Sequence, residues 1–204
     1  MKDTRPEPSK GKRQGRPKGD KRQRTRARLL AAAADVIGER GWDRTSLDEV
    51  ARRAGMTRGA IYGNFKNREE LFLATVQTRW KPVIPPLADG MTFRDYMHAL
   101  GKAVAAATPA RRAQAVGALS FMLYALTHDE MRVQIARFNG ELYGRGARRF
   151  TEAFDRSELP IPPEHLIPVL HALTDGLTFL RFMTPELITD KMVVAAFDAL
   201  AKQG

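Results

Sequence analysis

The sequence predicts an all-α protein with a small N-terminal helical domain and a larger C-terminal one, and three observations support this fold class. Apolar residues recur at helical spacing along most of the chain, for example between residues 29 and 37, whereas β-branched runs are few. Glycines and prolines interrupt this pattern at intervals typical of helix ends. A proline cluster at residues 82–86, followed by Asp89-Gly90, separates the two parts.

Four helices are expected before the proline cluster. The first begins near Arg24 and ends at Gly41, a residue suited to a C-terminal cap, and the fourth ends near Trp80. After the cluster, the periodicity predicts helices at about 92–107, 110–127, 129–156, 163–182 and 186–202. Breaks are expected at Thr108-Pro109, at His128-Asp129, across 159–163 and at Thr184-Pro185.

The composition excludes several classes of protein. The 204 residues contain no Cys, which rules out disulfides, thiolate metal sites and cysteine nucleophiles. No apolar run approaches the roughly 20 residues of a membrane span, and no secretory signal follows the basic N-terminus. Phosphate loops, nucleophile elbows and metal-ligand spacings are absent from the sequence. We therefore expect a soluble cytoplasmic protein that is not an enzyme and needs no cofactor or metal.

Most of the positive charge lies at the N-terminus. Residues 1–28 contain twelve Lys or Arg against three Asp or Glu, a net charge of +9 out of +11 for the whole chain. Residues 1–22 lack hydrophobic periodicity, so we expect a disordered arm. Charge alone is compatible with a solubilising tail or with an arm that seeks DNA phosphates. Within it, residues 14–19 resemble an AT-hook core whose first Arg is Gln, so Arg16 and Lys18 are candidates for the minor groove.

Residues 46–65 predict a helix-turn-helix. Thr45 is expected to cap the first helix, with Asp48 three residues on. Gly55 allows the sharp turn, and Thr57 is expected to cap the second helix. A full capping box is predicted for the next helix, from Asn67 with Glu70.

The second helix of this motif has an exposed face suited to DNA. Arg58 is the candidate for a guanine contact, while Tyr62 and Lys66 suit phosphates. Ile61 and Phe65 are expected to face the core. The complete set of predicted DNA-binding residues is Arg16, Lys18, Arg26, Thr45, Thr57, Arg58, Gly59, Ala60, Tyr62, Asn64 and Lys66. An ordinary three-helix cluster without nucleic acid is the alternative, but the caps, the turn glycine and the adjacent arm together favour DNA binding.

Residues 41–71 resemble the DNA-binding domain of the tetracycline-repressor (TetR/AcrR) family. The resemblance is close from Arg24 to Arg79 and only architectural beyond. Two positions depart from the family pattern, because Gly63 replaces a bulky residue and Asn64 replaces His or Tyr. The pattern is carried by Gly41, Thr45, Val50-Ala51, Ala54-Gly55-Met56-Thr57, Ile61-Tyr62, Phe65-Lys66 and Glu69-Glu70-Leu71.

The resemblance implies an omega-shaped homodimer whose variable helical domain binds a small ligand and dimerises through its last two helices. Together with the composition of residues 1–22 and the proline cluster, it divides the chain into a disordered basic arm (1–22), a helix-turn-helix DNA-binding domain (23–80) and a helical effector-binding and dimerisation domain (81–204). The predicted effector-binding residues are Tyr96, Phe121, Tyr124, Arg137, Asn139, His171 and Asp175.

Two apolar stripes in the last helices predict the dimer interface, because a monomer would leave an oversized apolar surface. The alternative is that they face the monomer's own core. The stripes consist of Leu166, Leu170, Leu173, Leu177 and Leu180, and of Met192, Val193, Ala196, Phe197 and Leu200.

These observations predict a sequence-specific transcriptional regulator, foremost a repressor that a small, largely apolar ligand releases from a near-palindromic double-stranded operator. Two alternatives remain: an architectural DNA-binding protein without an effector, and a ligand-dependent activator.

Overall fold

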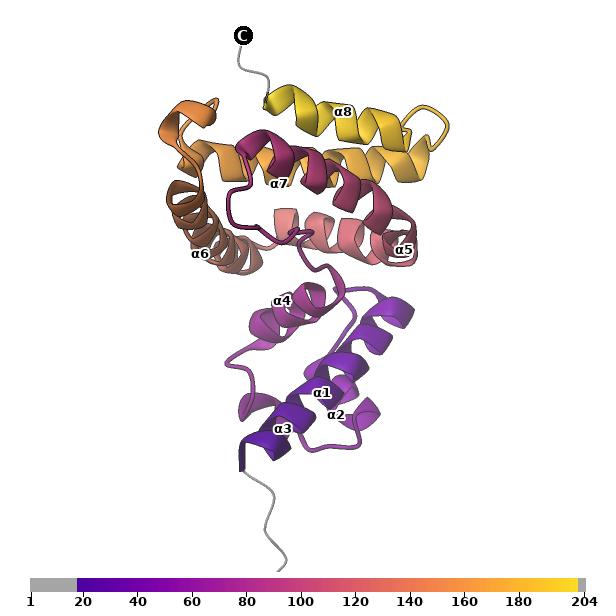
Figure 1. The fold of residues 1–204 in the computed structure, drawn as a ribbon. Helices are drawn as coiled ribbons and strands as arrows, with labels where there is room; N and C mark the ends of the chain where they lie inside the picture. Colours follow the sequence, from indigo (N-terminus) through magenta and orange to yellow (C-terminus); the bar gives the residue numbers. More distant parts are fainter. Residues whose placement is uncertain (1–17, 202–204) are drawn as a thin grey trace, which may run out of the picture.

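The computed structural model describes residues 18–201, and within this range the chain is helical without any strand (Figure 1). The predicted all-α fold class is therefore confirmed. The helices are α1 (Lys18–Arg40), α2 (Leu47–Arg53), α3 (Arg58–Tyr62), α4 (Arg68–Arg79), α5 (Phe93–Thr127), α6 (Asp129–Ala153), the short 3-10 helix η1 (Arg156–Glu158), α7 (Pro163–Met183) and α8 (Asp190–Leu200).

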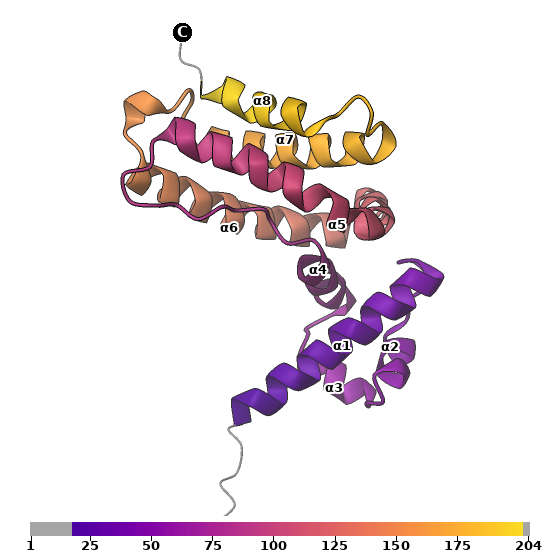
Figure 2. The ribbon, with the colours of Figure 1, turned by 45° about the vertical axis from the view of Figure 1, so that its right-hand side comes forward.

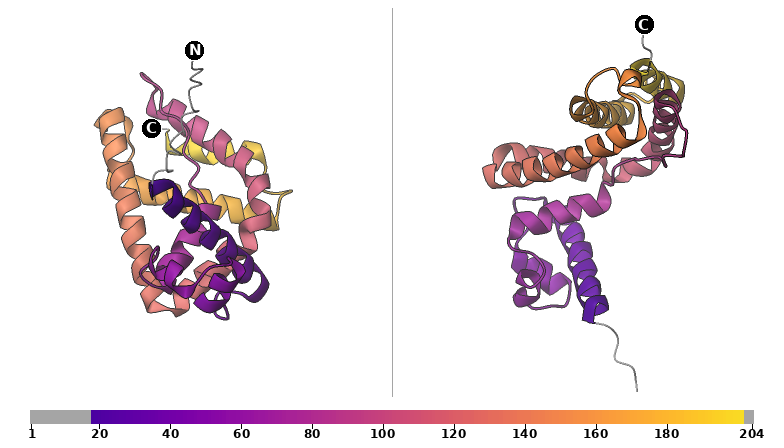
Figure 3. Two further views of the ribbon diagram at one scale, coloured as in Figure 1. Left: turned by 90° about the horizontal axis from the view of Figure 1, so that it is seen from below. Right: turned by 60° about the vertical axis from the view of Figure 1, so that its left-hand side comes forward.

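Helices α1 to α4 form a small unit below a bundle made by α5 to α8 (Figures 1 and 2). Helix α1 packs against α2 and α4, and α4 lies directly beneath the bundle in the right-hand view of Figure 3. Helix α1 begins at Lys18, so residues 18–22, which we expected in a disordered arm, are helical.

The bundle core is closed by a tight contact between α5 and α8. A Cβ placed on Gly101 would lie 2.9 Å from the Val194 Cα and 3.4 Å from the Phe197 Cβ. The two helices can therefore approach this closely only because residue 101 has no side chain. Phe93, Tyr96, Phe150 and Phe154 pack edge-on or tilted beside this contact.

The predicted helix break at Thr108-Pro109 is wrong, because α5 runs through both residues. Pro109 has no N–H for the carbonyl of Ala105. The Arg181 Nη1 atom donates to that carbonyl at 3.5 Å instead, and Thr108 Oγ1 donates to the Val104 carbonyl at 2.8 Å. The helix bends in this region, as Figure 2 shows, rather than ending.

The second half of α5 belongs to the core of the N-terminal unit. Phe121, Tyr124 and Met131 are buried in the same cluster as Trp42 and Phe72. The Trp42 ring centroid lies 4.9 Å from that of Phe121 and 5.1 Å from that of Phe72. Residues from distant parts of the sequence thus complete one apolar core.

Most residues of the two apolar stripes predicted for a dimer interface face the core of their own monomer. Leu166, Leu170, Leu177, Val193 and Phe197 are buried in the bundle core of the monomer itself. For these residues the alternative prediction, packing in the monomer's own core, is therefore confirmed. Leu180 and Met192 remain exposed, and they share the surface of α7 and α8 with other apolar side chains.

Helix α7 requires a correction to the expectation about membrane spans. It is long and apolar enough to cross a membrane by length and composition, with a mean hydropathy of 1.2 over its most apolar segment. One such helix is weak evidence, since a mostly buried core helix of a soluble protein meets the same criterion. Only 22% of that segment is buried inside the monomer, which leaves an apolar surface to be explained.

Candidate nucleic-acid interface

The first helix of the motif begins one residue later than predicted. Ser46, rather than Thr45, caps α2, since its Oγ accepts from the Glu49 N–H at 3.2 Å. Thr45 is 2% exposed, and its hydroxyl donates to the Gly41 carbonyl at 2.7 Å. The predicted role of its side chain as a cap and as a DNA contact is therefore wrong, because the hydroxyl is turned into the fold.

The turn between α2 and α3 follows the prediction. Gly55 has φ of 61°, in the left-handed region where a residue with a side chain would be strained. The Met56 N–H returns to the Ala51 carbonyl at 2.9 Å. Arg28 Nη2 donates to the Ala54 carbonyl at 2.8 Å, so α1 holds the turn in place.

Helix α3 presents its N-terminal turn to solvent while its other side is buried. Ile61 and Phe65 are buried in the core, as predicted. Thr57 precedes the helix, but its side chain makes no capping hydrogen bond, contrary to the expectation. Thr57, Arg58 and Gly59 are exposed, and Ala60 is half-buried.

Arg58 and Tyr62 share an exposed face of α3, and Asp48 of α2 lies beside them. Arg58 Nη1 donates to Asp48 Oδ2 at 3.1 Å, and Nη2 donates to the Tyr62 hydroxyl at 3.3 Å. These contacts, first that with Tyr62, raise the pKa of Arg58 above its ordinary value. A guanidinium is protonated at physiological pH whether or not these contacts form.

Asn64 is less available to DNA than predicted. Its Nδ2 donates to the Ala60 carbonyl of its own helix at 2.8 Å. Its Oδ1 is buried and has no hydrogen-bond partner among residues 18–201. Gly63 caps α3 with an ordinary right-handed φ of −70°, so its lack of a side chain is not a backbone requirement.

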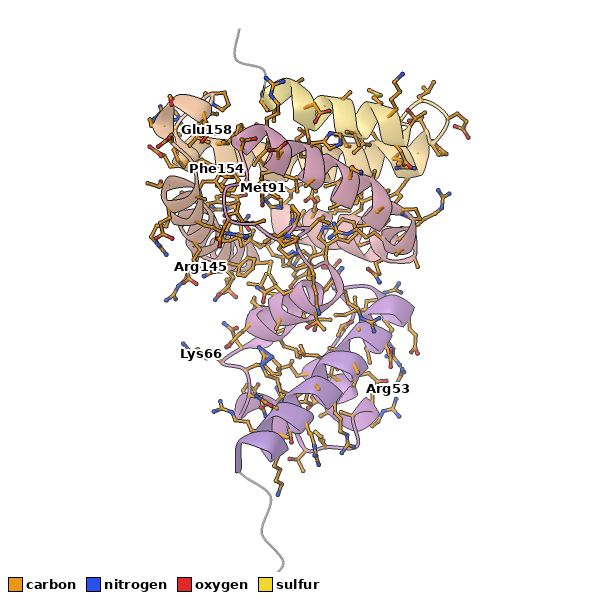
Figure 4. All side chains as sticks on the ribbon, viewed as in Figure 1. Arg53, Lys66, Met91, Arg145, Phe154 and Glu158 are labelled. Atoms are coloured by element: carbon orange, nitrogen blue, oxygen red, sulfur yellow. The ribbon has the colours of Figure 1, made fainter. Side chains whose placement is uncertain are left out.

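Of the two hydrogen bonds of the capping box predicted for α4, one forms as predicted and the other has a different partner. Asn67 Oδ1 accepts from the Glu70 N–H at 2.8 Å, as predicted. The Glu70 carboxylate accepts from the N–H of Lys66 at 2.6 Å, one residue earlier than the expected partner. The Lys66 side chain points away from the fold, as Figure 4 shows.

The N-terminal part of α1 lies at the same end of the molecule as α3 (Figure 1). The Arg26 guanidinium carbon lies 4.5 Å above the Phe65 ring, which places this cation next to the motif. Arg16 lies outside the described residues, and of Lys18 only the backbone is described.

Two glutamates of the N-terminal unit are paired with arginines of α2. Glu39 contacts Arg53 at 2.6 Å, and Glu49 contacts Arg52 at 2.5 Å. The hydrogen bond from each arginine holds the pKa of its glutamate below the ordinary value. These pairs neutralise cations of α2, and Arg53 lies on the opposite side of the unit from Lys66 (Figure 4).

The predicted effector residues occupy separate places. Tyr96 lies in the bundle core, where burial raises the pKa of its hydroxyl, and Phe121 and Tyr124 lie in the N-terminal core. Arg137 is exposed and faces Glu141 at 3.7 Å. Asn139 is half-buried on α6. One predicted pair, His171 and Asp175, does meet, at 3.3 Å.

The His171–Asp175 pair belongs to a junction that the sequence did not reveal. Tyr143 Oη and His171 Nδ1 lie 2.7 Å apart, and Trp80 Nε1 donates to Asp175 at 3.4 Å. The Trp80 ring stacks on Phe179 with centroids 5.3 Å apart. We define Trp80, Arg111, Tyr143, His171 and Asp175 as the α4 junction, because Arg111 also lies over the Trp80 ring at 4.8 Å and donates to the Lys81 carbonyl.

An open groove lies between α1 and α4 and ends at Lys81, next to this junction. Its volume is about 420 Å³. It is lined by Gln23, Arg26, Ala27, Leu30, Ala74, Gln77, Thr78 and Lys81. Arg26 is the one lining residue that also belongs to the predicted DNA contacts.

Comparison with known proteins agrees with this geometry. Residues 29–75 match the family described as bacterial regulatory proteins, tetR family. A stretch of 56 residues is 45% identical to the transcriptional regulator TtgR of Pseudomonas putida. This match covers 28% of the present chain and 27% of TtgR. A stretch of 56 residues is 39% identical to the transcriptional activator FasR of Mycolicibacterium smegmatis. This match covers 28% of the present chain and 26% of FasR. The matches thus span under a third of these relatives.

Solved structures extend the likeness along the chain. A putative TetR-family regulator from Rhodococcus sp. aligns with a TM-score of 0.68 at 21% identity, over 88% of this chain and all (100%) of that one. NalD, described as the secondary repressor of the MexAB-OprM multidrug efflux pump in Pseudomonas aeruginosa, aligns with a TM-score of 0.58 at 25% identity, over 87% and 93%. These are transcriptional regulators and not enzymes. The N-terminal domain is therefore that of the TetR family of bacterial regulatory proteins, and the fold of the whole chain is similar to that of TetR-family regulators.

Proposed function

We propose that this protein is a homodimeric, cytoplasmic transcriptional repressor that binds a near-palindromic operator through α3 and leaves it when a small, largely apolar ligand binds. The observation that carries the proposal is the exposed N-terminal turn of α3, where Arg58 is free of the core and the basic start of α1 lies at the same end. A recognition helix reads the major groove through such N-terminal residues.

In this proposal the residues of the interface divide the work by chemistry. Arg58 contacts guanine. The small Gly59 and Ala60 let the backbone approach the groove, and Thr57, Tyr62 and Lys66 contact phosphates. Arg26 adds a cation beside them. This division excludes Thr45, whose buried hydroxyl is bonded to Gly41.

The basic arm is proposed to follow the minor groove with Arg16 and Lys18. Deleting residues 1–20 should weaken DNA binding and flatten its dependence on salt, because fewer counterions are released. The slope of log K against log salt concentration measures this, and an unchanged slope would contradict the role of the arm.

Dimerisation is proposed through the exposed face of α7 and α8. Val169, Leu180 and Met183 are exposed at helical spacing, and Met192 is exposed on α8. The exposed Gly176 lies between them, and no atom of residues 18–201 lies within 4 Å of a Cβ added there, so another helix has room to approach closely. A four-helix interface between two copies would cover this surface.

Ligand control is proposed through α4. This helix joins the DNA-binding unit to the bundle at the α4 junction, so a ligand that displaced Trp80 or Asp175 would shift α4. Such control requires the ligand to bind the two arrangements with unequal affinity. One neighbour supports a small-molecule effector, since its structure is that of a SmeT–triclosan complex, at 25% identity and a TM-score of 0.56 over 89% of this chain and 94% of that one.

Activation is the second candidate, because FasR is described as an activator. One experiment separates the candidates. The purified protein selects duplexes from a random-sequence pool, and the selected site is placed upstream of a reporter. A repressor lowers reporter output and an activator raises it. Apolar compounds, triclosan among them, are then tested for release from the selected duplex; failure of a broad panel would favour DNA binding without an effector.

A further inference from the structure

The carboxylate of Asp48 holds the arginine that is proposed to read DNA. Asp48 Oδ2 lies 3.1 Å from Arg58 Nη1, across the turn that joins α2 to α3. On the other side, the Tyr62 hydroxyl accepts from Nη2 at 3.3 Å, and the guanidinium carbon lies 5.8 Å from the Tyr62 ring centroid. The guanidinium is thus fixed at two points before any DNA is bound.

The availability of Asp48 follows from how α2 begins. Because Ser46 is the N-cap, the capping hydrogen bond comes from the backbone of Glu49, and Asp48 is not part of the cap. Glu49 turns to Arg52 instead, at 2.5 Å. The Asp48 side chain, 67% exposed, is left to reach Arg58, which is 56% exposed.

This placement of a carboxylate is costly on a surface that meets phosphates, since like charges repel. It is also a poor device for stability, because exposed ion pairs contribute little to folding. The neighbouring glutamates neutralise arginines of α2, whereas Asp48 is paired with the cation of the reading helix. A function in positioning that cation accounts for both facts.

We propose that Asp48 is a positioning residue that determines specificity by holding Arg58 in the orientation that reads guanine. The inference rests on the proposed function, namely sequence-specific binding through α3. An arginine has five N–H donors. The contacts with Asp48 and Tyr62 occupy two and leave three for the base.

The pair therefore persists while Arg58 contacts guanine O6 and N7, which accept two parallel N–H groups. A phosphate contact, by contrast, requires Arg58 to swing away from Asp48 and brings a phosphate toward that carboxylate. Asp48 in this way favours contact of Arg58 with the base over contact with the DNA phosphates. A supporting hydrogen bond generally fixes the orientation of a side chain that contacts a ligand.

The test compares four proteins by selection from a random-sequence duplex pool: wild type, D48N, R58A and the double variant. The readout is the preference for guanine over the other bases at each position. We expect the wild type to prefer guanine at one position per half-site and R58A to lose that preference. D48N should lower it by about fivefold, the scale of one exposed charge-assisted contact.

The double variant separates positioning from simple charge removal. D48N alone also removes a charge that repels DNA, so total affinity for random duplex rises in either case. In the R58A background, however, D48N should change no base preference, since no arginine is left to position. D35N is the matched control, because it removes an exposed carboxylate of α1 in the same unit and should leave the guanine preference intact.

The outcomes distinguish the inference from its basis. If the wild type and D48N enrich guanine equally, the role of Asp48 is overturned, while the proposed function stands. The same follows if D48N weakens preferences at all positions alike, or does so without Arg58. A wild-type protein that enriches no sequence contradicts the proposed function and the inference with it. Thermal unfolding of each variant should match the wild type, because both side chains are exposed.

Discussion

Single side chains join segments of this protein that lie far apart in the sequence. Arg68, the first residue of α4, donates to the carbonyls of Trp42 and Asp43 at 2.7 and 3.1 Å and to the Tyr124 hydroxyl at 3.3 Å. Its guanidinium also lies 4.7 Å from the Phe72 ring centroid. One arginine therefore connects the loop after α1, the start of α4 and the second half of α5.

Replacing this arginine should destabilise the whole fold. R68A leaves two carbonyls and a hydroxyl without their donor, so we expect the free energy of unfolding to fall by about 2–3 kcal/mol in urea denaturation. R132A is the control, because Arg132 forms an exposed pair with Asp129 and should change stability by less than about 0.5 kcal/mol. Equal effects of the two variants would show that Arg68 is an ordinary surface charge.

The pH dependence of stability should reveal His171. Its hydrogen bond with Asp175 raises the pKa of His171 above 6.5, against the opposing effect of burial. A group whose pKa is raised on folding stabilises the fold at pH below its unfolded value, and that contribution is lost as the pH rises through the folded value. H171Q should therefore cost most stability below pH 6.5, and the difference from wild type should shrink as the pH rises past the higher folded pKa. A difference that is constant from acid to neutral pH would contradict the assignment.

At the scale of helices, the contact between α5 and α8 depends on a missing side chain. G101A should force the helices apart, because the added Cβ meets the backbone of Val194, and we expect a loss of about 1–3 kcal/mol of unfolding free energy. Gly117 is the matched control in the same helix, since a Cβ there meets no atom within 4 Å in the part of the chain that the structure describes. G117A should stabilise by up to about 1 kcal/mol through helix propensity. Denaturant unfolding of both variants tests the pair, and a neutral G101A would contradict the close approach.

The helices were predictable where the signal was local and not where it was tertiary. The turn at Gly55 and the buried Ile61 and Phe65 follow from glycine chemistry and helical spacing, and both were predicted. Pro109 predicted a break because the sequence does not show Arg181, 72 positions later, donating to the Ala105 carbonyl. The buried Thr45 and the Asp48–Arg58 contact were not predicted, because the cap of α2 lies one residue later than expected, at Ser46. This shift turns the Thr45 side chain into the core and leaves Asp48 outside the cap.

At the scale of the whole molecule, two exposed apolar surfaces compete as dimer interfaces. One includes Leu180 and Met183 on α7, and the other includes Val116, Leu123 and Leu126 on the second half of α5. The proposal commits to α7. L180E should therefore convert the dimer to a monomer at micromolar concentration in light scattering, because a charge would be buried in the interface. V116E places the same charge on the other surface and should leave the dimer intact; the reverse result would assign the interface to α5.

Trp42 and Phe72 pack on Phe121, and the same core contains Met131. Anyone who grafts the DNA-reading part of this protein onto a different sensor domain meets a practical limit there. A fusion made after residue 80 would leave those aromatic rings facing water. A working chimera has to import the surface of α5 and α6 that covers them, or rebuild it in the recipient, before it can inherit the choice of operator.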